Sequence, residues 1–251
     1  MQNKYEFKYN TFMRLDKYLY EHFKLQSRNK ACELIKNNKI KLNGKIISKA
    51  SFQVLDTPTI EILQEDFYVS RSAYKLKHFL EEINLDLENT RALDIGSSTG
   101  GFTQILLENK VKHVTCVDVG SNQLHDKVKE NQNIDFFENT DIRDFTSSHE
   151  FDIVTCDVSF ISILYIIEDI NRLASKDIII LFKAQYEVGS NVKRNTKGVV
   201  LDSKAITKAR EKFTDTCQAL NWTLRYNNFS KVTGKEGNNE ELFYFTKKKT
   251  T

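Results

Sequence analysis

The first quarter of the chain has hydrophobic positions that follow a helical period and then a strand period. Apolar residues at helical spacing predict two short helices, at residues 14–23 and 28–37, and Ser27 is a favourable N-cap for the second. Between residues 39 and 47, apolar and basic residues alternate on both sides of Asn43-Gly44, a strong hairpin signal. Residues 59–63 predict one more strand. Because so short a segment buries only a modest core, the pattern indicates an accessory α+β module.

The rest of the chain alternates strand-like apolar runs with amphipathic helical runs. We expect strands at residues 91–96, 113–120, 134–139, 151–159 and 177–183, and helices near 71–82, 101–109, 123–130, 162–174 and 202–220. Such alternation predicts a parallel sheet with helices on both faces. The runs at 222–231 and 241–248, which no helix separates, are expected to pair as an antiparallel edge. The prediction is a small domain at 1–63, a polar linker at 64–70 and a Rossmann-like α/β domain at 71–251.

Charge is distributed unevenly between the two predicted domains. Residues 1–63 carry 12 Lys and Arg against 6 Asp and Glu, whereas the remainder carries 25 against 28. A basic module attached to a near-neutral body is typical of proteins that bind a polyanion. A basic face that serves only solubility gives the same numbers, so charge alone leaves both interpretations open.

Several classes of protein lack support in the sequence. The four cysteines and five histidines are scattered without ligand spacing, so we expect no metal site. Apolar runs are too short to span a bilayer, and residues 1–10 are polar, so we expect neither a membrane segment nor a secretion signal. Reduced, buried thiols then favour a cytoplasmic protein, expected to be a monomer.

A turn of small residues follows the first strand of the larger domain. Leu93 to Gly96 form an apolar strand end, and Ser97-Ser98-Thr99-Gly100-Gly101 lead into a helix that begins near Phe102. Small residues let the backbone approach a ligand, and the helix N-terminus offers free N–H donors. The spacing is not that of a dinucleotide-binding G-x-G-x-x-G, and no phosphate-binding lysine follows. A nucleoside cofactor is favoured.

Acidic residues at later strand ends fit that interpretation. Asp118 ends the second strand, where a carboxylate can accept both ribose hydroxyls, and Asp141 follows the third strand, within reach of an adenine edge. Both could instead be ordinary turn residues. Asp157 and Lys183 end the fourth and fifth strands, and each alone is more often a simple cap. Together, at neighbouring strand ends, they predict a reaction centre.

The motifs resemble those of a known family along nearly the whole chain. Residues 93–103 are similar to the FtsJ-like RNA methyltransferases, and more narrowly to the TlyA family of ribosomal-RNA 2′-O-methyltransferases, whose older label is haemolysin. That family also shows the segments Val117-Asp118-Val119-Gly120 and Lys197-Gly198-Val199-Val200. In the small domain, Arg14-Leu15-Asp16-Lys17, Ser27-Arg28 and Lys41-Leu42-Asn43-Gly44 resemble the RNA-binding S4 domain.

The resemblance implies a cofactor, a reaction centre and a substrate. The cofactor is S-adenosylmethionine, for which the expected binding residues are Asp94, Gly96, Ser97, Ser98, Thr99, Gly100, Gly101, Phe102, Asp118, Val119, Asp141 and Ile142. The implied catalytic tetrad is Lys75, Asp157, Lys183 and Glu240, in which we assign Lys183 as the base, Asp157 and Lys75 as its electrostatic partners and Glu240 as a positioning group. The residues expected to face RNA are Arg14, Lys17, Arg28, Lys30, Lys41 and Arg71.

The implied substrate is a cytidine ribose in 23S rRNA of the large ribosomal subunit, with 16S rRNA as a further target in some members. In that family the modification influences sensitivity to antibiotics such as capreomycin. Two departures from the family pattern lie beside the tetrad: Ser72-Ala73 stand where two glycines are usual, and Ala184 stands where a proline is usual. We expect the helix entry before Lys75 to differ, because Ser and Ala adopt positive φ poorly.

Three alternatives stay open at this point. A haemolysin would need a membrane-spanning helix or a secretion signal. A non-catalytic RNA-binding assembly factor would not need the tetrad, yet all four residues are present. A base methyltransferase acting on exocyclic amines would favour an Asn-Pro-Pro-Tyr/Phe-type motif after the fourth strand, where Asp157-Val158-Ser159-Phe160 stands instead.

Overall fold

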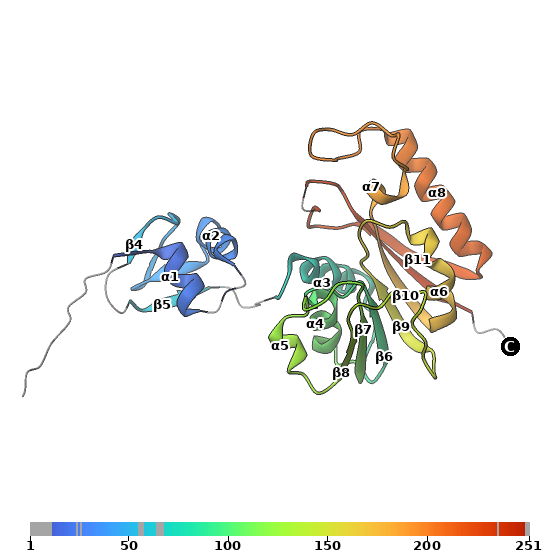
Figure 1. Ribbon diagram of the computed structural model, residues 1–251, viewed down its shortest axis with the longest axis horizontal. Helices are drawn as coiled ribbons and strands as arrows, with labels where there is room; N and C mark the ends of the chain where they lie inside the picture. Colours follow the sequence, from blue (N-terminus) through green and yellow to red (C-terminus); the bar gives the residue numbers. More distant parts are fainter. Residues whose placement is uncertain are drawn as a thin grey trace, which may run out of the picture. The chain divides into compact units, whose positions relative to one another are not determined.

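Figure 1 shows a computed structural model of the chain, which describes residues 12–23, 25, 27–54, 58–63, 68–234 and 236–248. The chain divides into two units, Met1–Phe67 and Tyr68–Thr251. Residues 64–67 of the expected linker lie outside the described residues. Tyr68 and Val69 are buried in the second unit, so the expected linker end at residue 70 is corrected to an earlier position.

The first unit contains short helices and strands around a small core. Its elements are β1 (Met13–Arg14), α1 (Leu15–His22), α2 (Arg28–Lys36), β2 (Ile40–Leu42), β3 (Lys45–Ile46), β4 (Gln53–Val54) and β5 (Ile60–Ile62). The expected hairpin joins β2 to β3, and Asn43 and Gly44 both have positive φ, as its turn requires. Ser27 caps α2 by accepting the N–H of Lys30 at 3.2 Å. The prediction of a small α+β module is confirmed.

The second unit alternates strands with helices. Its elements are α3 (Arg71–Ile83), β6 (Arg91–Ile95), α4 (Gly101–Glu108), β7 (His113–Val117), α5 (Asp126–Lys129), β8 (Ile134–Phe137), β9 (Phe151–Cys156), η1 (Ile163–Tyr165), α6 (Ile167–Leu173), β10 (Ala174–Phe182), α7 (Ala184–Glu187), α8 (Ser203–Ala219), β11 (Trp222–Phe229) and β12 (Glu241–Lys247). The seven strands form one sheet in the order β11-β12-β10-β9-β6-β7-β8. The five strands β6, β7, β8, β9 and β10 are parallel to one another. Strand β12 lies between β10 and β11 and runs antiparallel to both.

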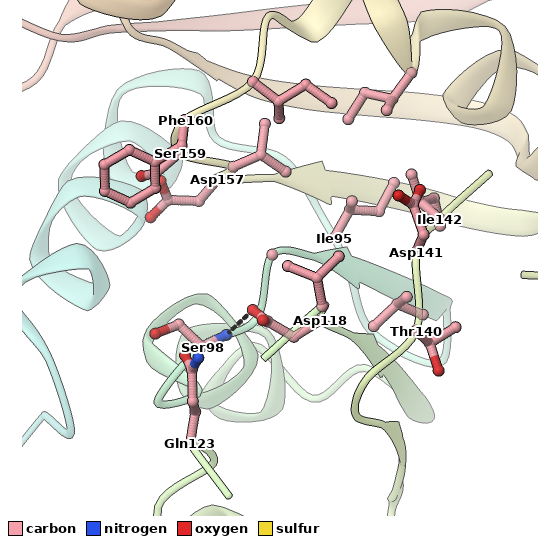
Figure 2. A pocket seen from close by; sticks show the side chains of 16 residues that line it. Ile95, Ser98, Asp118, Gln123, Thr140, Asp141, Ile142, Asp157, Ser159 and Phe160 are labelled. Carbon is pink, nitrogen blue, oxygen red and sulfur yellow. Dashed lines mark hydrogen bonds between the residues drawn. The ribbon is translucent and has the colours of Figure 1, made fainter. Parts of the chain in front are cut away.

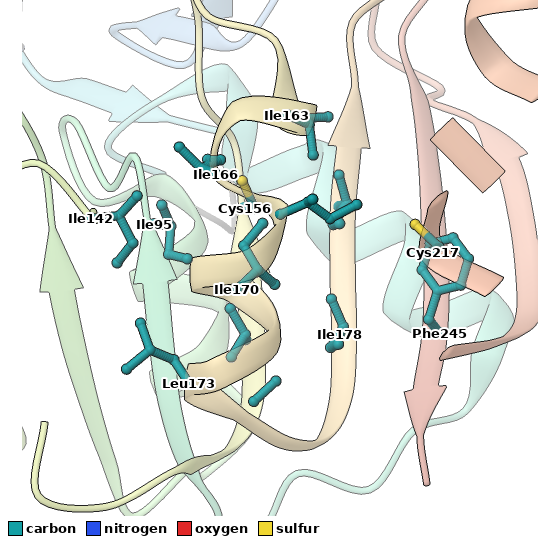
Figure 3. Packing of buried hydrophobic residues seen from close by; sticks show 14 of the residues in the cluster. Ile95, Ile142, Cys156, Ile163, Ile166, Ile170, Leu173, Ile178, Cys217 and Phe245 are labelled. Carbon is teal, nitrogen blue, oxygen red and sulfur yellow. The ribbon is translucent and has the colours of Figure 1, made fainter. Parts of the chain in front are cut away.

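Helices cover both faces of this sheet, as predicted. In β10, Ile178, Ile180 and Phe182 pack toward α6 and α8, whereas Ile179 and Leu181 pack on the opposite side with α3 and α4. Figure 3 shows the first of these layers, with α6 lying over the strands and running along them. Alternating side chains that are buried on both faces explain why the strands read as nearly continuous apolar runs.

The sheet order places a switch point between β6 and β9. From β6 the chain proceeds to β7 on one side, and from β9 it proceeds to β10 on the other, although β6 and β9 are hydrogen-bonded neighbours. Ligands of open α/β sheets bind in the crevice at the carboxyl ends of such strands. The residues that follow β6, β7, β9 and β10 are therefore expected to line that crevice.

Candidate active site

The turn after β6 is built for close backbone approach. Gly96 has φ of +76°, and a Cβ there would lie 2.9 Å from the carbonyl oxygen of Asp157. Gly100 has φ of +89° and is the N-cap of α4. Any other residue at Gly96 would push the end of β6 away from the end of β9, so the glycine keeps the two strand ends in contact.

A cavity of about 310 Å³ opens at the switch point (Figure 2). The residues that line it come from the ends of β6, β7, β8 and β9, and they include Gly96, Ser98, Asp118, Val119, Asp141, Ile142 and Asp157. A second cavity of about 180 Å³ shares Gly96, Ser98, Asp157 and Ser159 with the first. Ser70, Ser72, Ser97, Thr99, Phe102 and Lys183 complete its wall. The two cavities therefore meet at Asp157.

Two carboxylates on the wall of the larger cavity differ in how they are held. Asp118 accepts the backbone N–H of Ser98 at 2.8 Å and that of Gly120 at 2.7 Å, which fixes its carboxylate against the turn (Figure 2). Asp141 accepts both a side-chain fork and a backbone N–H from Arg143, and this partner lowers the pKa of Asp141. Asp118 is thus aimed by backbone groups, whereas Asp141 is already paired with a cation.

Three of the expected cofactor residues do not line either cavity. Asp94 is fully buried, where it accepts the hydroxyls of Thr103 at 2.6 Å and Thr155 at 2.9 Å. Burial raises the pKa of Asp94 to about 6. A Cβ on Gly100 would meet Leu124, and one on Gly101 would meet Ser70 and Ser72. These three residues shape the turn and its helix, whereas the other nine expected cofactor residues line one or both cavities.

The four tetrad residues come together from separate elements. Asp157 follows β9 and Lys183 follows β10, and these adjacent parallel strands end at the same edge. Strand β12 runs the other way, so Glu240, just before it, reaches that edge as well. Lys75 projects from the first turns of α3. All four side chains are buried or nearly so, and the carboxylate of Asp157 interacts electrostatically with the other three.

Two ion pairs organise the tetrad. Lys183 Nζ lies 2.6 Å from Asp157 Oδ1 and donates a hydrogen bond to Ser159 Oγ at 2.8 Å. Lys75 Nζ donates to Glu240 Oε2, and the amide of Gln185 donates to the other oxygen of Glu240 at 3.4 Å. Each buried charge has an opposite partner, which such burial requires.

Burial and charge act on the Lys183–Asp157 pair in opposite directions. Burial raises the pKa of Asp157, against the pull of Lys183 and Lys75. Burial acts to lower the pKa of Lys183, but the carboxylate of Asp157 outweighs it and leaves that pKa above its ordinary value. The amine therefore holds its proton at neutral pH in this state.

The two departures from the family pattern are accommodated without strain. Neither Ser72 nor Ala73 has positive φ, and α3 begins regularly at Arg71. The start of α3 packs closely against the start of α4, and Gly101 of α4 leaves the room for this contact because it has no Cβ. Ala184 is the first residue of α7, a position where proline and alanine are both compatible with a helix.

Sequence patterns missed two residues at the centre. Ser159, two residues beyond Asp157, holds the Lys183 amine. Phe160 has φ of +69° and is 90% exposed on the wall of the larger cavity, beside Tyr186 at 5.4 Å between ring centroids. A bulky residue in a left-handed conformation is rare, and such strain gathers at functional sites.

The expected RNA-facing residues differ in their exposure. Arg14 and Arg28 flank the carboxylate of Asp16, and Lys17 is exposed beside Glu21. Lys41 pairs with Glu61 at 3.3 Å. The side chain of Lys30 is only 12% exposed and pairs with Glu33, so it is the least accessible of the set. Arg71, the first residue of α3, is exposed on the second unit.

Comparison with known proteins identifies the family. Residues 68–248 match the FtsJ-like methyltransferases, and residues 13–57 match the S4 domain. The chain is 46% identical to the 23S rRNA (cytidine-2′-O)-methyltransferase TlyA of Campylobacter jejuni, over 94% of this chain and 100% of that relative. The chain belongs to the TlyA family of FtsJ-like methyltransferases.

Other members of this methyltransferase family agree in length and fold. The 16S/23S rRNA (cytidine-2′-O)-methyltransferase TlyA of Mycobacterium tuberculosis is 32% identical over 92% of this chain and 88% of its own length. A protein from Streptococcus thermophilus that is described as a hemolysin has a solved structure with 28% identity and a TM-score of 0.71, over 95% of this chain and 90% of that one. The predicted family and fold class are confirmed.

Two further observations concern metal-type clusters and membrane-length helices in the described residues. Within the described ranges, no group of three or more His, Cys, Asp or Glu side chains is arranged to hold a metal ion. In the same part of the chain, no helix is both long enough and apolar enough to cross a membrane.

Proposed function

We propose that this protein transfers the methyl group of S-adenosylmethionine to the 2′-hydroxyl of a cytidine in ribosomal RNA, with 23S rRNA of the large subunit as the main substrate. The observation that carries the proposal is the pair of buried ion pairs, Lys183–Asp157 and Lys75–Glu240, beside a cavity at the switch point. The 46% identity to a 23S rRNA enzyme supports the choice of subunit. We also propose that it acts in the cytoplasm as a monomer, and 16S rRNA is the second substrate to test.

The cavity residues fit a nucleoside cofactor with a charged tail. Gly96 has no Cβ, so its backbone is open to a ligand in the larger cavity. Asp118 offers carboxylate oxygens for ribose hydroxyls. Ile142, Val119 and Ile161 supply apolar walls that suit a flat base. Ser97, Ser98 and Thr99 line the second cavity, which leads to Lys183. When bound, S-adenosylmethionine supplies an electrophilic methyl group on a positively charged sulfur.

The tetrad residues then act on the ribose hydroxyl. A hydroxyl is a poor nucleophile, so its proton must leave as the oxygen attacks. We assign Lys183 Nζ as the acceptor of the hydroxyl proton after its own proton has been released to solvent, with Asp157 and Ser159 holding the amine in place. A cationic ligand bound near Lys183 would lower the pKa of the Lys183 ammonium, which favours the deprotonated amine. Glu240, held by Lys75, orients the ribose or the amine.

RNA is delivered by two kinds of group. The exposed cations of the S4 domain suit phosphate contacts, which position RNA without reading its sequence. Phe160, exposed at the cavity wall, offers a flat face on which an unstacked base can rest, as aromatic side chains do in many RNA-binding proteins. A base held there would leave its ribose near the tetrad.

The proposal is tested with labelled cofactor and purified ribosomal subunits. The protein should label large subunits, and mapping should find the methyl group on a cytidine 2′-oxygen. Lys183→Ala should lose transfer while its affinity for S-adenosylhomocysteine, measured by calorimetry, stays within a few-fold of the parent. Label on a base, or no transfer to either subunit, would sink the proposal. If Lys183→Ala stays active, the proposed methyl transfer stands, but the assignment of Lys183 as the base is wrong.

A further inference from the structure

A buried carboxylate in the S4 domain lies between two arginines. Asp16, the second residue of α1, is only 2% exposed. Its Oδ1 accepts Arg14 Nε at 3.0 Å, and its Oδ2 accepts Arg14 Nη2 at 3.1 Å and Arg28 Nε at 2.8 Å. Arg14 is the N-cap of α1 and Arg28 is the first residue of α2. One carboxylate therefore joins the beginnings of two helices through two guanidinium groups.

The arginines keep one side toward solvent while Asp16 holds the other. Their side chains are 46% and 49% exposed. A guanidinium has five N–H donors on three nitrogens. Arg14 donates to Asp16 from two of its nitrogens, and Arg28 donates from one. Among the described residues, Nη1 of Arg14 and both Nη atoms of Arg28 have no hydrogen-bond partner. Both groups bind the same Oδ2, so one carboxylate oxygen holds the two arginines together.

Electrostatics explains why this arrangement is fixed. Burial acts to raise the pKa of Asp16, but the hydrogen bonds from Arg14 and Arg28 outweigh it and hold the pKa well below its usual range. The carboxylate is therefore ionised throughout the physiological range, and the three side chains keep a net charge of +1. Without it, two adjacent guanidinium groups would repel each other and lose their shared orientation.

We propose that Asp16 is a positioning residue that fixes Arg14 and Arg28 as one phosphate-binding site for the backbone of folded RNA. The inference rests on the proposed action on ribosomal RNA, and it deepens that function by assigning a role to an acidic residue. Guanidinium groups bind phosphate through parallel N–H donors, so a preset orientation costs less entropy on binding. Two guanidinium groups held by one carboxylate, each with free N–H donors, suit the phosphates of an RNA backbone.

The proposal makes a prediction opposite to that of charge alone. Asp16→Asn raises the net charge of the RNA-binding surface by one unit, which by itself strengthens binding to a polyanion. If positioning dominates, the same change weakens binding at least 10-fold. Glu21→Gln is the matched control, because it removes an exposed carboxylate from the same helix and touches neither arginine. It should bind at least as tightly as the parent.

The experiment uses the full chain and purified large ribosomal subunits, with the dissociation constant measured by fluorescence polarisation at several salt concentrations. Asp16→Asn should bind at least 10-fold more weakly, while its rate at saturating subunits stays within about two-fold of the parent. Equal or tighter binding by Asp16→Asn overturns the inference. Arg28→Lys keeps the charge and the pairing with Asp16 but loses the fork, so it should also bind about 10-fold more weakly, and unchanged affinity contradicts the site.

The outcomes separate this inference from the proposed function. A parent chain that binds subunits but transfers no methyl group sinks the function, while the ratio of the Asp16→Asn and parent affinities still decides the inference. A parent chain that does not bind subunits overturns both. If Asp16→Asn has a lowered thermal unfolding midpoint, Arg28→Lys, which keeps the buried carboxylate paired, decides the question.

Discussion

Phe182 of β10 and Glu241 of β12 face each other in antiparallel register, and this pairing brings Lys183 and Glu240 to the same edge of the sheet. The two residues are far apart along the chain, yet the register leaves little freedom in where they meet. A slip of one residue would turn Glu241 and its neighbours to the other face. The geometry of the tetrad therefore depends on strand pairing in the core more than on the loops.

Removing one partner of the Lys75–Glu240 pair should destabilise the protein. Lys75→Met leaves Glu240 buried without its cation, which costs about 3–5 kcal/mol of unfolding free energy. The double variant Lys75→Met/Glu240→Leu should recover most of that stability and remain inactive. Urea denaturation and a methyl-transfer assay check the two readouts. Glu88→Gln, which breaks an exposed pair with Lys110, is the control and should change stability little. Full activity in the double variant would contradict the catalytic role.

The raised pKa of Lys183 predicts how the rate depends on pH. Because the amine must lose its proton before it can accept another, the single-turnover rate should rise with pH. Asp157 is the main group that raises this pKa, ahead of Glu240 and Tyr186, so Asp157→Asn should move the rising limb to lower pH while it lowers the maximal rate. Rates measured between about pH 6 and pH 10 check the shift. A limb that stays in place would show that another group takes the proton.

Much of the site could be predicted because strand ends are easy to recognise. Asp157 and Lys183 each follow an apolar run, and parallel neighbours end at one edge, so their proximity followed from the sheet order. The Lys75–Glu240 contact could not be found in this way. It joins a helix to the residue before β12, and their meeting depends on long-range register that local patterns do not encode. The family resemblance supplied those two residues.

Asp94 and Phe160 differ in how far local sequence predicts their surroundings. Side chains alternate along a strand, so Asp94 points with Ala92 toward α4, while Ile95 faces the cavity side. The alternation can be read from the sequence, and it assigns Asp94 to the face that packs on α4. The left-handed backbone of Phe160 has no such signal, because the surrounding fold imposes it.

Asp118 should contribute to cofactor affinity more than to the chemical step. Its carboxylate is held by Ser98 and Gly120 on the wall of the larger cavity, away from Lys183. Asp118→Ala should raise the dissociation constant for S-adenosylhomocysteine at least 10-fold, with a smaller effect on the rate at saturating cofactor. Asp141→Ala is the comparison, because Arg143 already engages that carboxylate, and its effect should be weaker. Calorimetry measures both. If the two substitutions raise the dissociation constant equally, the cofactor ribose does not bind at Asp118 as proposed.

The buried carboxylate of Asp94 should make the protein less stable as pH rises toward neutrality. Its pKa is about 6 in the folded state, against about 4 in an unfolded chain. A raised folded pKa gives stability that is fully present below the unfolded value and is lost as pH rises through the folded value, here by about 3 kcal/mol. Other carboxylates act in the opposite direction, so the effect is best read as a difference. Asp94→Asn, which stays neutral, should gain stability relative to the parent between about pH 4 and pH 7.

Urea denaturation at a series of pH values measures that difference, with Asp144→Asn as the exposed control for the loss of one carboxylate. The hydroxyls of Thr103 and Thr155 can each donate or accept, so the amide can be satisfied in place of the carboxylate. Because these two threonines tie α4 and β9 to β6, a change that keeps their hydrogen bonds should leave cofactor affinity nearly unaltered. A stability difference that does not vary with pH would mean that Asp94 titrates as an ordinary exposed acid, and the physical account of this buried residue would fail.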